Sequence, residues 1–194
     1  ICHSKIKEHL EIRDSILSEI DKTSDSDLEQ KDSFYTDSIS KLDWDISDKL
    51  DRPWVKIFLP VFIKNLKEVI DNLGYAKVVI QNIWYQQYLE GDTHGWHIHD
   101  DHFTGVYYIE FPEGCSQTEI ISPYDFKAVK IDASEGDFVV FPAHYIHRGL
   151  PNGNKRKTII SYNFSADGSP IDDKCSLNTN LIKKVNPNIW HSQN

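Results

Sequence analysis

Runs of β-branched and aromatic residues dominate the middle of the chain, beginning with YAKVVIQNIWYQQYL at residues 75–89. These residue types favour strands. Shorter runs of the same kind follow, namely GVYYIEF, TEIIS, KAVKI, DFVVF and KTIISYNF, separated by the turn-forming sequences PEG, SPYD, SEGD and PNGN. No long helical pattern lies between them. The pattern therefore predicts a mainly β sandwich or barrel and not a parallel α/β sheet.

The first 74 residues show helical spacing instead. Apolar side chains recur every three or four positions between residues 5 and 20, which predicts an amphipathic helix. They are Ile6, Leu10, Ile16, Leu17 and Ile20. A second helix is expected within residues 54–73, where Pro60 either starts or breaks it and Gly74 stands at the position of a C-cap glycine. The polar stretch DKTSDSDLEQKDS, residues 21–33, predicts a loop.

The length of 194 residues suits one domain with a substantial core. We divide the chain into three parts. Residues 1–74 are expected to form a helical and polar segment packed on the barrel, and residues 75–165 the β core that carries the chemistry. Residues 166–194 have little pattern and are expected to form a tail.

The composition narrows the class of partner. The net charge of -9 argues against binding to nucleic acid or to anionic membrane surfaces. No apolar run reaches the length of a membrane span. Three widely spaced cysteines, Cys2, Cys115 and Cys175, are typical of a reducing compartment. We therefore expect a soluble cytoplasmic protein, whose acidic N-terminal segment could cover the barrel, cap the active site or mediate a homodimer.

Histidines are concentrated in YLEGDTHGWHIHDDHFTGVYYIE, residues 88–110, which holds four of the nine in the chain. In an extended strand His97 and His99 face the same side, and so do His99 and Asp101. Either pair offers two ligands to a transition metal. A third ligand must come from elsewhere, and His147 in GDFVVFPAHYIHRGL is the candidate. The histidines expected outside the ligand set are His94, His102 and His144.

A basic residue and a hydroxyl follow the distal histidine. Arg156 lies nine residues after His147, and Thr158 lies two further on, so it faces the same side as Arg156. A guanidinium beside a hydroxyl suits bidentate binding of a carboxylate. The pair predicts a clamp for a small acid that chelates the metal with its other end. Lys157 is the next candidate if Arg156 does not fill this role.

Together these motifs resemble the Fe(II)/2-oxoglutarate-dependent oxygenases, close to the prolyl-hydroxylase-like branch. YLEGDTHGWHIH is similar to the tyrosine-x-x-glycine segment that leads into the family's H-x-D motif, and TGVYYIE resembles the strand after it. GDFVVFPAHYIHRGLPN resembles the strand that delivers the distal histidine. RKTIISYNF resembles the strand with an arginine and a hydroxyl residue. The resemblance covers residues 80–165, a little under half the chain.

The resemblance implies a double-stranded β-helix, which is a jelly roll or cupin-like barrel, backed by N-terminal helices. It implies Fe(II) held by His97 and His147, with 2-oxoglutarate as cosubstrate. The residues matched to the cosubstrate are Arg156, Thr158, Tyr108 and Tyr88. The implied activity is hydroxylation of a C–H bond in a small-molecule or peptidyl substrate by O2, with release of succinate and CO2.

One position departs from the family's two-histidine, one-carboxylate triad. His99 stands where the carboxylate is expected. Two ligand sets are therefore compatible with the sequence. His97, His99 and His147 form a three-histidine site, or Asp101 reaches the metal from the following turn. The spacing favours the three histidines, whereas the usual chemistry of the family favours including Asp101.

Cupins share the same barrel and offer an alternative. GDTHGWHIH and GDFVVFPAHYIH fit the cupin spacings of glycine and histidine. The cupin glutamate is missing, because Phe103 and Thr104 stand at its position, and so is the glycine after Pro142. Arg156 with Thr158 favours the oxygenase over a cupin-type dioxygenase or isomerase, and over a non-catalytic jelly-roll binding or structural protein.

Overall fold

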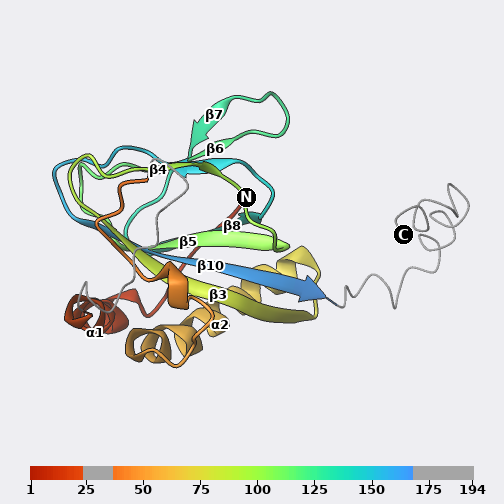
Figure 1. Ribbon diagram of the computed structural model, residues 1–194. Coiled ribbons are helices and arrows are strands. Elements are labelled where there is room, and N and C mark those ends of the chain that lie inside the picture. The colour runs from red at the N-terminus through yellow and green to blue at the C-terminus, as the bar shows by residue number, and fades with distance from the viewer. Residues whose placement is uncertain (24–36, 168–194) are drawn as a thin grey trace, which may run out of the picture.

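Two helices lie against one face of a layered β structure in the computed structural model, which describes residues 1–23 and 37–167 (Figure 1). The helices are α1 (His9–Lys22) and α2 (Pro53–Leu73), with a 3-10 turn, η2 (Trp44–Ile46), between them in sequence. The strands are β1 (Cys2–Lys5), β2 (Lys41–Leu42), β3 (Lys77–Tyr88), β4 (His94–His97), β5 (Phe103–Glu110), β6 (Thr118–Ile121), β7 (Ala128–Lys130), β8 (Asp137–Pro142), β9 (His147–Gly149) and β10 (Lys157–Asp167).

The strands form two antiparallel sheets. Six strands pair in the order β1-β8-β5-β10-β3-β2, and four in the order β4-β9-β6-β7. The helices pack against one face of the six-stranded sheet, and a second apolar core joins its other face to the four-stranded sheet. Because the large sheet is covered on both faces, its central strands are almost continuously buried, as their apolar sequences predict.

Strand β10 shows how the two faces are divided. Ile160, Tyr162 and Phe164 pack with α1 and α2, whereas Ile159 packs in the core between the sheets. Successive side chains of a strand point to opposite faces. We call the face toward the four-stranded sheet the interior face. On β10 it carries Lys157, Ile159, Ser161 and Asn163.

The helix predicted within residues 54–73 is α2. Its buried face includes Phe58 and Phe62, whose rings stack at 4.9 Å. Gly74 ends the helix with φ 81°, as expected of a C-cap glycine. The expectation that Pro60 starts or breaks the helix is wrong, because Pro60 lies inside it on the exposed side. Burial of the aromatic face outweighs the backbone hydrogen bond lost at proline.

The N-terminal part of the chain contributes to the barrel as well as covering it. Strand β1 pairs with β8, and β2 pairs with β3. The short strands β1, β4 and β9 were not predicted, since none of them lies in a run of β-branched and aromatic residues. Most of the predicted loop (24–33) and of the predicted tail (168–194) lies outside the described residues. Neither α1 nor α2 has the length and apolar character needed to cross a membrane.

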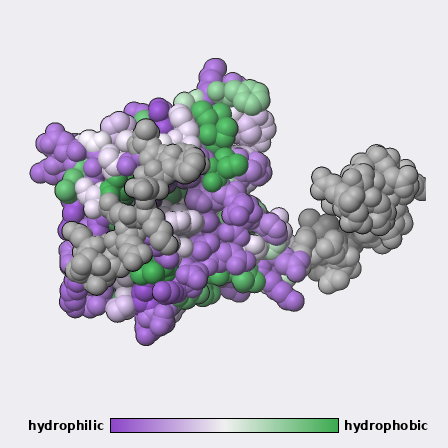
Figure 2. All heavy atoms as spheres, viewed as in Figure 1, coloured by the Kyte–Doolittle hydropathy of each residue, from purple (hydrophilic) through white to green (hydrophobic). Residues whose placement is uncertain are grey.

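Hydrophilic residues dominate the face of the molecule seen in Figure 2. Hydrophobic residues reach that surface in small groups, one of them along the β6–β7 hairpin. Phe126 and Val129 of this hairpin are 81% and 49% exposed. Most of the apolar side chains are instead in the two cores described above.

Candidate metal centre

Three histidines converge on the interior side of the barrel. His97 ends β4, His99 lies two residues further on, and His147 begins β9. His97 and His147 are register partners of these antiparallel strands. One ring nitrogen of each histidine lies within 4.8 Å of those of the other two. The ring centroids are 4.2 Å apart for His97 and His147, 5.1 Å for His97 and His99, and 5.2 Å for His99 and His147.

The backbone fixes the proton on two of these imidazoles. His97 Nδ1 lies 2.8 Å from the carbonyl oxygen of Gly95, and His147 Nδ1 lies 2.9 Å from that of Tyr145. A carbonyl only accepts hydrogen bonds, so each Nδ1 carries the proton and donates it. The lone pair is then on Nε2. This is how protein imidazoles are usually held for metal binding.

Burial keeps the three imidazoles neutral. Desolvation lowers the pKa of His147 to about 2 and that of His99 to about 3, with the neighbouring histidines acting in the same direction. Desolvation also lowers the pKa of His97, against the Gly95 carbonyl and Asp37, which favour its charged form. A metal ligand must be unprotonated at the binding nitrogen. The cluster therefore presents three neutral nitrogen donors at neutral pH.

Asp101 and the three histidines expected outside the ligand set do not belong to this cluster. His94 stacks on His97 with ring centroids 3.9 Å apart, and it bonds to Gln86 and to Asp37 instead. Asp101 accepts a hydrogen bond from Ser165 at 3.2 Å, and its carboxylate does not belong to the set of donor atoms that lie within 4.8 Å of one another. His102 forms hydrogen bonds with the backbone of Ala166. His144 is exposed, and its ring contacts that of Tyr145. The geometry thus favours His99 over Asp101 as the third donor.

The donor set fits a divalent transition metal. Imidazole suits Fe, Zn, Cu and Ni, and three such donors on one side of an ion leave other positions for exogenous ligands. Within the described part of the chain, no carboxylate belongs to the cluster. A bound divalent ion would therefore keep its full positive charge and favour anionic ligands.

Two tryptophans stand beside His99. Trp84 of β3 is 3% exposed, with its ring centroid 5.6 Å from that of His99. Trp44 of η2 is 42% exposed and lies 4.5 Å from Trp84, edge to face, and 6.5 Å from His99. Asp43 holds η2 in place, because it accepts from the Tyr85 backbone N–H at 2.8 Å. The N-terminal part of the chain thus provides an aromatic side chain next to the cluster.

A buried lysine lies on the interior face of β10. Lys157 is 2% exposed; its Nζ donates to the Ser116 carbonyl at 3.1 Å and lies 4.2 Å from the centre of the Tyr88 ring. None of the described carboxylates is within ion-pair distance of it. Burial lowers the pKa of Lys157 to about 8, against Cys115 and Asp92, which act in the opposite direction. A buried lysine that lacks an ion-pair partner is a candidate for binding an anion.

The two predicted tyrosines lie in the same core. Tyr88 and Tyr108 are each 1% exposed and belong to the apolar cluster between the sheets. The Tyr108 hydroxyl donates to Thr118 Oγ1 at 3.0 Å. Both tyrosines therefore lie in the same interior core, and the Tyr88 ring contacts Lys157.

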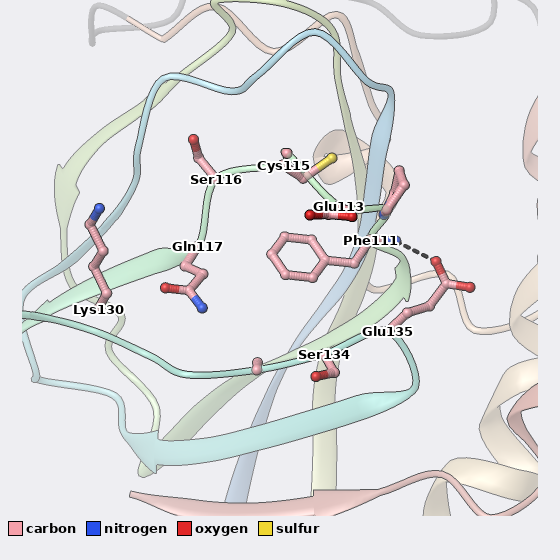
Figure 3. Close-up of a pocket in the computed structure, with 11 residues that line it drawn as sticks. Phe111, Glu113, Cys115, Ser116, Gln117, Lys130, Ser134 and Glu135 are labelled. Carbon is pink, nitrogen blue, oxygen red and sulfur yellow. Dashed lines mark hydrogen bonds between the residues drawn. The ribbon is translucent and has the colours of Figure 1, made fainter.

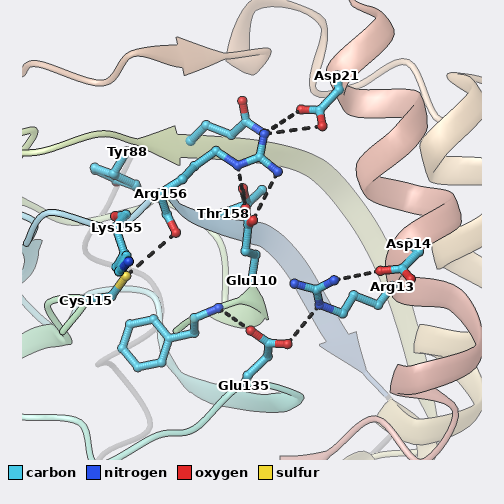
Figure 4. A network of polar contacts seen from close by, with 12 residues as sticks. Arg13, Asp14, Asp21, Tyr88, Glu110, Cys115, Glu135, Lys155, Arg156 and Thr158 are labelled. Carbon is cyan, nitrogen blue, oxygen red and sulfur yellow. Dashed lines mark hydrogen bonds and ion pairs between the residues drawn. The ribbon is translucent and has the colours of Figure 1, made fainter. Parts of the chain in front are cut away.

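Arg156 and Thr158 lie on the opposite face of β10 (Figure 4). Arg156 donates to both carboxylate oxygens of Glu110, at 2.8 and 3.0 Å, and pairs with Asp21 of α1 at 3.1 Å. Thr158 Oγ1 donates to Glu110 at 2.7 Å. The two residues share a face, as predicted, but that face is turned toward α1. The structure therefore does not bring the two residues to the histidine cluster, because alternation along β10 directs Lys157 inward and its two neighbours outward.

A pocket of about 400 Å³ adjoins the Lys157 region (Figure 3). It is lined by residues 111–117 and 133–135 together with Lys130. Ser116, whose carbonyl accepts from Lys157, is one of the lining residues. None of the clustered histidines lines this pocket, so it is separate from the metal centre.

Comparisons with known proteins agree with this architecture. No family model and no curated protein matches the sequence. Solved structures do match. A prolyl hydroxylase from Trichoplax adhaerens, in complex with a hypoxia inducible factor oxygen degradation domain peptide fragment, has a TM-score of 0.62 at 17% identity, over 84% of this chain and 83% of that one.

Two further structures extend the likeness. The viral collagen prolyl hydroxylase of Paramecium Bursaria Chlorella virus-1, in complex with 2OG, has a TM-score of 0.58 at 17% identity over 86% of this chain and 96% of that one. A 2OG-Fe(II) oxygenase family oxidoreductase from Burkholderia pseudomallei has a TM-score of 0.52 at 15% identity. That match covers 58% of this chain and 56% of the other. The chain therefore has the double-stranded β-helix fold of the 2OG-Fe(II) oxygenases and prolyl hydroxylases, with a three-histidine cluster inside it.

Proposed function

We propose that this protein is an Fe(II)- and 2-oxoglutarate-dependent oxygenase that hydroxylates a C–H bond of its substrate and releases succinate and CO2. One observation carries the proposal. Three neutral imidazoles lie in the interior of this barrel, and so does a buried lysine that has no carboxylate partner among the described residues. Such an interior suits a small dicarboxylate that binds the metal at one end and a cation at the other.

The metal would be held by His97, His99 and His147 through Nε2. When bound, Fe(II) would supply the redox chemistry that activates O2. The protein's own contribution is to hold the imidazoles and to exclude water. His97 and His147 are oriented by backbone carbonyls, and β4 and β9 fix their separation by direct pairing. Asp101 takes no part in this ligand set.

We assign the far carboxylate of 2-oxoglutarate to Lys157, in place of Arg156. An ammonium group in a buried site makes a strong hydrogen bond to a carboxylate, because little water competes for either partner. The carboxylate would also remove the penalty of burying the Lys157 charge alone. Tyr88 and Tyr108 would line the cosubstrate site, as the family resemblance implies.

The substrate would approach beside Trp44. This indole is partly exposed and next to His99, whereas Trp84 behind it is buried. Aromatic side chains with one exposed face bind small molecules and peptides well, since they offer a rigid apolar surface. We therefore propose a small-molecule or peptidyl substrate, with Trp44 as its first contact.

An anaerobic titration tests the proposed function. The apoprotein would be loaded with Fe(II) and then titrated with 2-oxoglutarate, while the visible charge-transfer band of the metal–keto-acid complex is recorded. A saturable band supports the proposal and justifies a substrate screen by succinate release. Failure to bind iron would overturn it.

Iron binding without the band would favour a second candidate, a metalloenzyme of the cupin type that does not use 2-oxoglutarate. The specific observation in its favour is the absence of a carboxylate from the described cluster. Three neutral donors also suit dioxygenase chemistry in which the substrate itself supplies the anionic ligand.

A further inference from the structure

A buried amide next to the cluster has a single polar contact. Asn163, on the interior face of β10, is 1% exposed. Its Nδ2 lies 3.4 Å from Nδ1 of His99, and its Oδ1 has no hydrogen-bond partner in the described structure. Burying an amide is unfavourable unless hydrogen bonds compensate for the lost water. The one side-chain partner of Asn163 is thus a histidine of the cluster.

His99 differs from the other two histidines in what faces its Nδ1. His97 and His147 each have a backbone carbonyl oxygen there, from the residue two positions earlier. His99 instead has the side-chain amide of Asn163, from the neighbouring part of the large sheet. The amide can present either its NH2 group or its oxygen to the ring.

The two amide orientations have opposite consequences for His99. An NH2 group donating to Nδ1 would place the imidazole proton on Nε2, which would remove the lone pair needed for a metal. After a 180° rotation of the amide, Oδ1 accepts from Nδ1–H and Nε2 is free. Binding of a metal by His99 Nε2 therefore requires the oxygen of Asn163 to face the ring.

We infer that Asn163 is a positioning residue for His99, holding its Nδ1 proton through the amide oxygen so that Nε2 is directed to the metal. This inference rests on the metal binding in the proposed function and not on the reaction. It also gives all three histidines the same arrangement, with an oxygen acceptor at Nδ1. The amide is neutral, so it orients His99 without adding the negative charge that a carboxylate would bring.

Two substitutions of Asn163 test whether its side chain accepts a hydrogen bond from His99 Nδ1 or donates one to it. Asn163→Asp keeps an oxygen acceptor at similar size, and Asn163→Leu removes all hydrogen bonding. Purified apoprotein would be titrated with Co(II), followed by its visible absorption. We expect Asn163→Leu to weaken Co(II) binding about 10- to 100-fold, the usual effect of losing such a partner. Asn163→Asp should bind Co(II) at least as tightly as the wild type.

The matched control is Thr104→Val. Thr104 is the register partner of Asn163 on β5, is 2% exposed and donates to the Tyr162 carbonyl, and none of the side-chain hydrogen bonds of the described residues joins it to a histidine. Its substitution should leave Co(II) affinity unchanged. A second readout is the proton of the His99 ring in the Zn(II)-loaded protein, observed by nitrogen–proton correlation NMR. We expect it on Nδ1 in the wild type and in Asn163→Asp.

The outcomes separate this inference from the proposed function. Equal weakening in Asn163→Leu and Asn163→Asp, or a Nε2 proton in the Zn(II)-loaded wild type, would overturn the role of Asn163 and leave the metal site intact. Unchanged Co(II) affinity in a folded Asn163→Leu protein would do the same. Absence of Co(II) binding by the wild type would instead overturn the metal site and the proposed function with it.

Discussion

The two faces of strand β10 carry opposite kinds of chemistry. On the face toward α1, Arg156 is fully engaged by Glu110 and Asp21. On the interior face, Lys157 is buried with a carbonyl and an aromatic ring as its neighbours. One cation is paired with two carboxylates, which lie on β5 and α1. Lys157 has no anionic partner among the described residues, as is expected of a residue that binds an anionic ligand.

This difference shows that a shift of one residue along a strand decides which of two adjacent cations faces the interior of the barrel. Adjacent residues of a strand point to opposite faces, so their roles cannot be exchanged without slipping the whole register. The register of β10 is fixed on both sides by long pairings with β3 and β5. The position of Lys157 on the interior face is therefore a consequence of the fold.

The largest expected effect is on the metal. His147→Ala removes one of three donors and should weaken Co(II) binding at least about 100-fold, more than the loss of an outer partner. The matched control is His144→Ala, three residues away on the exposed side of the turn. Direct titration followed by absorption measures both. Similar affinities in the two variants would show that the cluster does not bind the metal.

A change of pH is expected to have a smaller effect, on the affinity for 2-oxoglutarate. Burial lowers the pKa of Lys157 to about 8, so its ammonium form is lost as the pH rises through that value. The carboxylates of 2-oxoglutarate stay ionised throughout. Affinity of the metal-loaded wild type for 2-oxoglutarate should therefore fall about tenfold between pH 7 and pH 9, as measured by equilibrium dialysis. Arg156→Met should show the same fall. A fall of equal size in Lys157→Met would assign the titrating group elsewhere.

The smallest effects concern stability, and they should have opposite signs. A pKa lowered from 10.5 to about 8 corresponds to a penalty of about 3 kcal/mol on the charged Lys157 at pH 7. Lys157→Met removes this penalty and should raise the free energy of unfolding of the apoprotein by about 1–3 kcal/mol. Arg156→Met breaks partly exposed ion pairs and should lower it by about 0.5–1 kcal/mol. Denaturant unfolding compares the two, and destabilisation by Lys157→Met would show that its charge is already compensated.

The sequence allowed the barrel and the two helices to be predicted from local spacing, and it also indicated His97, His99 and His147 as candidates, which the pairing of β4 with β9 brings together. His97 and His99 are two residues apart, and the strand that leads to His147 is strongly apolar. The face occupied by Arg156 was not predicted. The apolar set Ile160, Tyr162 and Phe164 could have identified the helix-packed face and, with it, the outward direction of Thr158.

The other residues of the site depend on tertiary contacts that no local pattern records. Trp44 reaches His99 only because Asp43 fixes η2 against β3. Asn163 meets His99 because β10 lies beside the loop that follows β4. A single tryptophan or asparagine in a sequence has no spacing to mark it. Long-range pairing, which the sequence does not specify residue by residue, brings these groups together.

The most direct test of the central claim compares two neighbouring substitutions. Wild type, Lys157→Met and Arg156→Met would be loaded with Fe(II) without oxygen and titrated with 2-oxoglutarate, following the charge-transfer band. We predict that Lys157→Met weakens 2-oxoglutarate binding about 10- to 100-fold, the value of one charge-assisted hydrogen bond, and that Arg156→Met matches the wild type. Weakened binding in Arg156→Met with normal binding in Lys157→Met would contradict the assignment of the interior face to the cosubstrate.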